Sequence, residues 1–315
     1  MTRYKTAADQ CDVRNRAGLE EYRTKRERWL DWYEFRPSEP NSIQGQLFSM
    51  IFLDLGYRIV ANLRKREKAS EYAAASGLLV RLLDQGYVAN QILAIRKLMD
   101  GRKDVISVRR LLDDVSASRS LITREIYVCY DGLPYEHESW RNSAQSQEER
   151  IFGIEAPGLH EYLGSKYRHE RFDRLAGVAP DGRTRDDLVR PGVFANLVKW
   201  LEDSPATKLI TLSHKFFAHA ADNMSRDSLV YSGIQLTDVA ETQRAIIRVE
   251  RAITDHLLYL ATARDVVPFP PLGLVQGLDK LFAPVDAITT MHSEWDALAD
   301  QRNKWAEGLD EDLYR

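Results

Sequence analysis

Apolar residues recur three or four positions apart along most of this chain. Segments free of glycine and proline are long, and alternating apolar–polar stretches of strand length are scarce. A period of 3.6 residues lines one face of a helix, whereas a period of two lines one face of a strand, so the pattern predicts an all-α protein. The predicted helices cover residues 17–35, 42–66, 70–99, 107–130, 158–175, 192–202, 204–221, a long segment from 238, and 285–307.

Proline marks the expected boundaries between parts of the chain. Pro37 and Pro40 follow the first predicted helix, and a second group of prolines follows the long helix near the C-terminus. Proline removes a backbone donor and restricts the residue before it, so helices tend to end there. We therefore expect an N-terminal helix or arm at 1–40, a helical domain at 41–265, and a proline-rich linker with an acidic C-terminal helix at 266–315.

Residues 131–190 differ from the rest of the helical domain, because they are rich in glycine, proline and charged side chains. This composition predicts an irregular charged insertion, either a surface excursion or a small subdomain. Its role stays open between shaping substrate access, covering a cleft and binding a partner.

Three local contacts follow from residue spacing. Asp54 and Arg58 stand four positions apart in a predicted helix and are expected to pair. Ser107 precedes an apolar run and is expected to be a helix N-cap. Residues 238–241, Asp-Val-Ala-Glu, are expected to form a capping box.

Composition excludes several classes of protein. The polar N-terminus lacks the apolar core of a signal peptide, and no run of about 18 uninterrupted apolar residues is present. Cys11 and Cys129 are too few for a disulfide framework or a four-thiolate zinc site. Phosphate-binding, dinucleotide-binding and HExxH zinc motifs are absent from the sequence. We expect a cytoplasmic globular protein without membrane, metal or cofactor.

The net charge of −3 combines opposed regions. Residues 58–110 hold twelve lysines and arginines against five acidic residues, whereas residues 286–315 hold three against eight. One interpretation is solvated helix faces. The other is a phosphate-binding surface for which the acidic tail could compete. The candidate substrate-binding residues are Arg58, Arg96, Lys97, Arg102, Lys103, Arg109 and Arg110.

One histidine stands out in the predicted helix 204–221. At 100° per residue, His219 lies about 20° from Leu212 on the apolar stripe, with Lys215 one turn before it. A histidine there is either a packed core residue or a general acid or base titrating near neutral pH.

Two segments resemble the abortive-infection branch of the HEPN (higher eukaryotes and prokaryotes nucleotide-binding) superfamily. The first is residues 92–112, where Arg96, Asp100 and Ser107 punctuate apolar positions, as in the helix–turn–helix of that family. The second is residues 215–219, Lys-Phe-Phe-Ala-His, which is similar to the end of the family's motif helix.

The resemblance covers roughly residues 42–262 and implies a HEPN-like helical bundle. It also implies a metal-independent endoribonuclease of toxin or phage-defence type, working as a homodimer on RNA and in some cases held by an antitoxin protein. In the family, the motif histidine assists proton transfer as the 2′-hydroxyl attacks the adjacent phosphodiester, and a motif arginine stabilises the phosphate charge.

Carried over to this chain, the catalytic set is His219, Lys215 and His214, with His214 at the position of the motif arginine. A histidine lacks the guanidinium fork of arginine. Either the site is rewired, or the domain is a catalytically degenerate module for RNA binding or protein assembly. A third alternative is an unrelated helical protein in which His219 only packs. Residues 302–307 mimic the same motif, and we expect a chance similarity in a solvated, partly packed helix.

Overall fold

The computed structural model describes residues 3–39, 41–66, 77–138, 158–212, 235–260, 266–267 and 287–314. Every regular element in these residues is a helix, and the extended contacts among them are isolated bridges, so the all-α prediction is confirmed. None of the helices in the described ranges combines the length and apolar character needed to cross a membrane.

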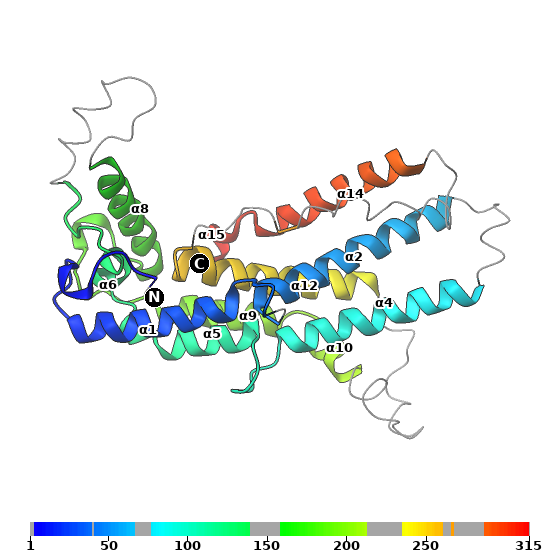
Figure 1. The fold of residues 1–315 in the computed structure, drawn as a ribbon, viewed down its shortest axis with the longest axis horizontal. Helices are drawn as coiled ribbons and strands as arrows, with labels where there is room; N and C mark the ends of the chain where they lie inside the picture. The colour runs from blue at the N-terminus through cyan, green and yellow to red at the C-terminus, as the bar shows by residue number, and fades with distance from the viewer. Residues whose placement is uncertain are drawn as a thin grey trace.

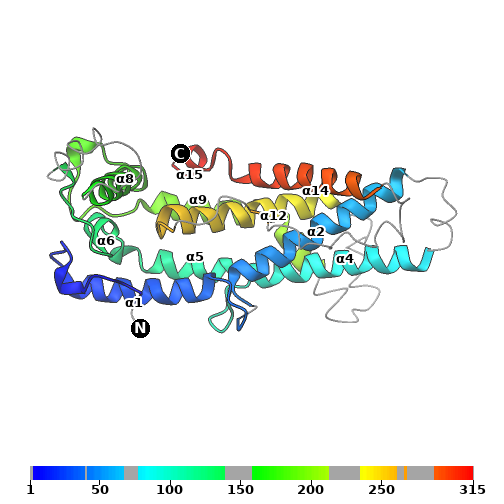
Figure 2. The ribbon, with the colours of Figure 1, turned by 45° about the horizontal axis from the view of Figure 1, so that its top comes forward.

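The helices form an elongated bundle (Figures 1 and 2). The long helices α2, α4 and α14 extend to one end, α6 and α8 lie at the opposite end, and α12 runs through the middle between them. The main α-helices are α1 (Arg16–Tyr33), α2 (Ile43–Arg66), α4 (Gly77–Leu98), α5 (Val108–Ala117), α6 (Arg124–Cys129), α8 (Leu159–Ala176), α9 (Pro191–Glu202), α10 (Ala206–Leu212), α12 (Leu236–Arg251), α14 (Ala287–Asn303) and α15 (Leu309–Leu313). Short helical turns are Ala8–Gln10, Arg119–Leu121, Pro180–Gly182, Ala252–Leu257 and Lys304–Ala306.

One apolar core connects the N-terminal helix with the long bundle. In α1, Tyr22 and Trp29 are fully buried and belong to the same cluster as Ile51 and Leu55 of α2. Trp29 also donates to Asp114 of α5, at 2.5 Å between Nε1 and Oδ2. The first helix is therefore built into the core of the protein.

The expected helix at 107–130 is wrong in one respect, because it is broken in two. Ser107 is the N-cap of α5, as expected, and its hydroxyl accepts from the backbone N–H of Arg110. The helix ends at Ser118, and Thr123 caps the separate helix α6. The N–H of Arg124, at the first residue of α6, donates to Asp187 O. This bond satisfies an N–H that has no partner within its own helix, so α6 can begin separately from α5.

The expected capping box at 238–241 is also wrong, by three residues. The helix α12 begins at Leu236, and its capping box joins Gln235 to Asp238. The carboxylate of Asp238 accepts from the N–H of Gln235 at 2.9 Å, so Asp238 is the third helical residue and not the cap.

The described part of segment 131–190 packs into the core. Phe172 and Leu175 of α8 are fully buried, and α8 lies against α6. Beneath it, Arg124 pairs with Asp173 at 2.7 Å and with Asp187 at 2.8 Å. The described part of the segment is therefore a structured end of the bundle.

The two helices of the acidic C-terminal segment pack in different places: α14 packs on α2, where Arg302 and Arg58 share Asp54, whereas α15 packs on α9. Leu309 and Leu313 of α15 are buried. Its carboxylates face arginines of α8 and α12: Asp310 pairs with Arg174 and Asp312 with Arg248. The negative charge of this helix is thus offset at the α8–α12 end of the bundle (Figure 1).

Candidate functional site

The turn between α4 and α5 is built by the residues that carry the family resemblance. The hydroxyl of Ser107 donates to Asp100 O and accepts from the N–H of Arg110. One serine therefore connects the end of α4 to the start of α5. Hydrogen bonds from Arg102 hold the pKa of Asp100 below its ordinary value, and the charge of Arg96 adds to the effect.

Four of the seven predicted phosphate-binding residues already have strong partners. Arg102 pairs with Asp100 at 2.8 Å, and Arg109 pairs with Asp113 at 3.1 Å. The guanidinium of Arg110 stacks on Trp32 with 4.1 Å to the ring centroid, and it also donates to a backbone carbonyl. These contacts leave little unpaired charge on Arg102 and Arg109 for a phosphate.

The fourth, Arg58, belongs to a buried cluster around Asp54. The carboxylate of Asp54 has no exposed surface, and it accepts from Arg58 Nε at 3.0 Å, as the four-residue spacing predicted. It also accepts from the Tyr87 hydroxyl at 2.6 Å and from Arg302 at 3.0 Å. Arg58 is therefore one of three donors that satisfy a buried charge, which is a structural role.

The expectation of a solvated, partly packed segment at 302–307 is consistent with the structure, in which Lys304 and Glu307 are exposed and the packed residue is Arg302. Its side chain is 2% exposed, and burial lowers the pKa of its guanidinium. The chain positions of Asp54 and Arg302 are 248 residues apart, so only the folded structure reveals the pair. The one signal in the sequence is a charge, Asp54, in the apolar middle of α2.

The other three predicted phosphate-binding residues are Arg96, Lys97 and Lys103, and they form no ion pair with the described residues. Arg96 and Lys97 occupy the last turn of α4. Lys97 is exposed, and Arg96 is partly exposed. The C-terminal end of a helix dipole favours such cations. Their charge is available to a ligand.

Lys97 lines a small polar pocket of about 220 Å³ between α2 and α4. Amide side chains line its walls, and several are held in place. Gln91 donates to Met50 O at 3.0 Å, and Gln46 donates to Ile106 O at 3.0 Å. The Gln46 amide oxygen is buried and has no hydrogen-bond partner among the described residues. The pocket therefore combines one exposed cation, Lys97, with amide side chains held in place by hydrogen bonds, a lining suited to a polar, anionic ligand.

The predicted catalytic residues His214, Lys215 and His219 lie outside the described residues. The described chain stops at Leu212 in α10, which packs against α4, and it resumes at Gln235. These two ends are joined by an ion pair between Lys208 and Asp238 at 2.8 Å.

Other histidines are committed to structural contacts. The Nε2–H of His169 donates to Tyr135 O with 2.9 Å between the atoms, and burial lowers the pKa of His169 to about 4. His256 faces Asp310 at 3.0 Å and the Tyr314 hydroxyl at 2.8 Å. Within the described ranges, no group of three or more His, Cys, Asp or Glu side chains is arranged to hold a metal ion.

The chain was compared with known protein families, curated proteins and solved structures. No protein-family model, no curated protein and no solved structure matches the chain.

Proposed function

We propose that this protein acts on RNA as a metal-independent endoribonuclease of toxin or phage-defence type, through His219. The observation that carries the proposal is the end of α4, where Arg96 and Lys97 keep their charge beside a polar pocket while neighbouring arginines are paired. Unpaired cations next to amide groups suit a phosphate with an adjoining base.

The ends of the segment that carries His219 support the same proposal. The segment leaves from α10, which packs on α4, and it returns at α12, where Arg58 donates to Leu236 O at 3.3 Å. The two described ends of the segment that carries His219 therefore both contact α4, the helix whose last turn carries Arg96 and Lys97.

In the proposed reaction, the 2′-hydroxyl of RNA attacks the adjacent phosphorus and the 5′-oxygen leaves. His219 exchanges the proton of the attacking or leaving oxygen, and Lys215 supplies a point charge to the phosphate. The products carry a 2′,3′-cyclic phosphate and a 5′-hydroxyl.

The direct test is incubation of the purified protein with a mixture of structured and single-stranded RNAs, with and without a chelator. We expect cleavage that survives the chelator, leaves 2′,3′-cyclic phosphate ends and is lost in His219→Ala. His292→Ala is the matched control, because His292 is exposed on α14. Equal silence of wild type and His219→Ala on all RNAs would contradict the ribonuclease proposal.

A second function is favoured by one observation, the histidine at position 214 in place of the motif arginine. Without a guanidinium fork, the domain would bind RNA or assemble with protein but not cleave. This alternative predicts salt-dependent RNA binding without turnover. RNA binding that does not change with salt would leave only the protein-assembly role.

A further inference from the structure

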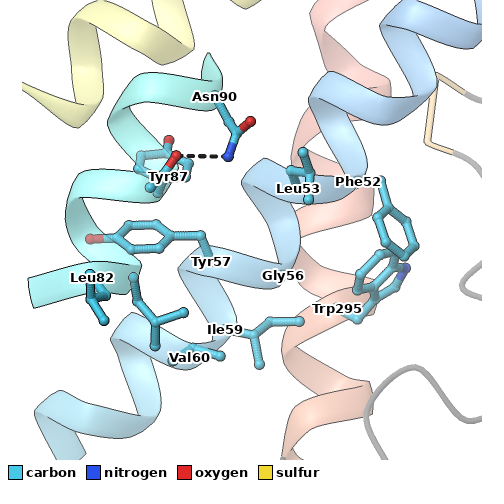
Figure 3. Close-up of a pocket in the computed structure, with 12 residues that line it drawn as sticks. Phe52, Leu53, Gly56, Tyr57, Ile59, Val60, Leu82, Tyr87, Asn90 and Trp295 are labelled. Carbon is cyan, nitrogen blue, oxygen red and sulfur yellow. Dashed lines mark hydrogen bonds between the residues drawn. The ribbon is translucent and has the colours of Figure 1, made fainter. Parts of the chain in front are cut away.

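An apolar pocket of about 400 Å³ lies between α2, α4 and α14 (Figure 3). It adjoins the polar pocket, with which it shares Leu53 and Asn90. Its volume falls within the roughly 300–1,000 Å³ of small-molecule sites. Neither lysine nor arginine lines it. Two rim leucines, Leu53 and Leu82, are 44% and 57% exposed, so the pocket opens to solvent.

Two glycines create this space. Gly56 of α2 and Gly86 of α4 both line the pocket, and a Cβ atom at either position would meet nothing within 4 Å. A glycine inside a helix costs roughly 0.5–1 kcal/mol relative to alanine. Gly164 of α8 shows the contrasting case, because a Cβ there would lie 3.0 Å from the Leu133 side chain in close packing. No such packing explains Gly56 and Gly86.

The aromatic walls of the pocket are held rigidly. Tyr57 stacks on Tyr87 with 3.8 Å between ring centroids and 8° between planes. The Tyr57 hydroxyl donates to Asp84 at 2.8 Å, and the Tyr87 hydroxyl donates to the buried Asp54. Since both hydroxyls have carboxylate partners, the rings are fixed by their polar ends and offer flat apolar surface.

On the α14 side, Trp295 packs edge-to-face on Phe52 with 5.7 Å between centroids. Figure 3 shows these two rings on one side of α2 and Tyr57 directed toward α4. The wall therefore presents aromatic surface on both sides of Gly56, which suits a flat ring more than a branched aliphatic chain.

Asn90 supplies the polar contact at the rim. Its amide nitrogen donates to Gly86 O at 2.8 Å (Figure 3). This bond orients the amide and leaves its oxygen as an acceptor for a ligand N–H or O–H.

We propose that this pocket binds an uncharged, flat, ring-containing small molecule that carries a hydrogen-bond donor at one edge. An apolar lining without a cation gives no compensation for the desolvation of a charged ligand, so charged compounds are excluded. The aromatic walls and the acceptor of Asn90 select a planar ring with one donor. This site adjoins the polar pocket of the RNA proposal through Leu53 and Asn90, but its binding argument uses none of the basic residues at the end of α4.

The experiment uses N-phenyl-1-naphthylamine, a neutral probe in which one N–H joins a naphthyl group to a phenyl ring. It fluoresces in apolar surroundings. Titration of the full chain is expected to give saturable binding of one probe per protein. Gly56→Leu and Gly86→Leu place a side chain in the hollow from opposite helices. We expect each to raise the Kd at least about tenfold, which corresponds to about 1.4 kcal/mol.

The matched control is Gly192→Leu on α9, where a Cβ also meets nothing within 4 Å but which does not line this pocket. It is expected to bind the probe as the wild type does. Leu82→Lys provides a variant at an exposed rim position that leaves the core intact, and it should weaken binding as well.

Three results would overturn the proposal. These are no saturable binding by the wild type, unchanged binding in both glycine variants and in Leu82→Lys, and an equal loss in Gly192→Leu. Far-UV circular dichroism checks the fold of each variant. If one glycine variant does not fold, the variant on the other helix and Leu82→Lys still decide the outcome.

Discussion

Removing Arg302 tests whether the C-terminal helix is fastened to the bundle by a buried charge. Arg302→Leu takes one of three donors from Asp54, whose carboxylate is fully buried. Breaking a buried ion pair costs about 3–5 kcal/mol, because it leaves the other charge uncompensated. Arg58 and Tyr87 remain as donors to Asp54, so we expect the lower end, about 3 kcal/mol.

A second contact adds to this loss. The guanidinium of Arg302 lies over Trp305 with 4.4 Å to the ring centroid, and a contact of this kind contributes about 0.5–2 kcal/mol. The assay is urea unfolding followed by far-UV circular dichroism, compared at equal m-value. The control is Arg102→Leu, which breaks an ion pair whose arginine is 69% exposed and should cost less than about 1 kcal/mol.

The double variant Asp54→Asn with Arg302→Leu completes a cycle that isolates the pair. Because the buried charge is then absent, its loss of stability should be smaller than the sum of the two single losses. If Arg302→Leu costs no more than Arg102→Leu, or if the two losses simply add, the pair does not fasten the helix and the reasoning fails.

Three further predictions concern RNA binding, pH and helix capping. Arg96→Ala should weaken RNA binding and reduce the salt slope of that binding by about one. Arg102→Ala should change the affinity and the slope little, because Asp100 already neutralises Arg102. Filter binding at several salt concentrations measures the affinity and the slope, and equal effects of the two variants would contradict the prediction. Burial raises the pKa of Glu250 to about 7, so the folded state holds this proton more tightly than the unfolded state and stability falls as the pH rises from about 4.5 to 7. Between pH 5 and pH 8, the free energy of unfolding of Glu250→Gln should therefore fall by up to about 3 kcal/mol less than that of the wild type. Urea titrations at several pH values measure this, and parallel pH curves for the two proteins would refute it. Ser107→Ala should lower the free energy of unfolding by about 1–2 kcal/mol, because it removes an N-cap and the bond to Asp100 O, and a thermal midpoint equal to wild type would contradict it.

Local features of this protein are predictable from neighbouring residues. The extents of α1 and α2, the cap at Ser107 and the pair of Asp54 with Arg58 all depend on residues at most a few turns apart, and the structure confirms them. The capping box of α12 is the local exception. Two overlapping patterns, Gln235 with Asp238 and Asp238 with Glu241, compete there, and sequence alone does not rank them.

The candidate site was predictable only in part. The sequence identified a basic region around the α4–α5 turn, yet it did not distinguish Arg96 and Lys97 from Arg102 and Arg109. That distinction depends on which carboxylates lie within 4 Å, and on backbone geometry that the periodicity of apolar residues does not specify. His214, Lys215 and His219 stay predictions.

The sequence by itself determined that the chain is helical, where most helices begin and end, and which faces are apolar, because these follow from residues within one helix. Only the tertiary structure decided that α5 and α6 are separate, that Arg302 satisfies Asp54, and that Gly56 and Gly86 open a pocket. Each of these depends on segments that are far apart in the chain and adjacent in space. Their contacts arise only when the apolar faces pack together. That packing brings the buried charges Asp54 and Arg302 into contact, and it places the glycines Gly56 and Gly86 at the same hollow.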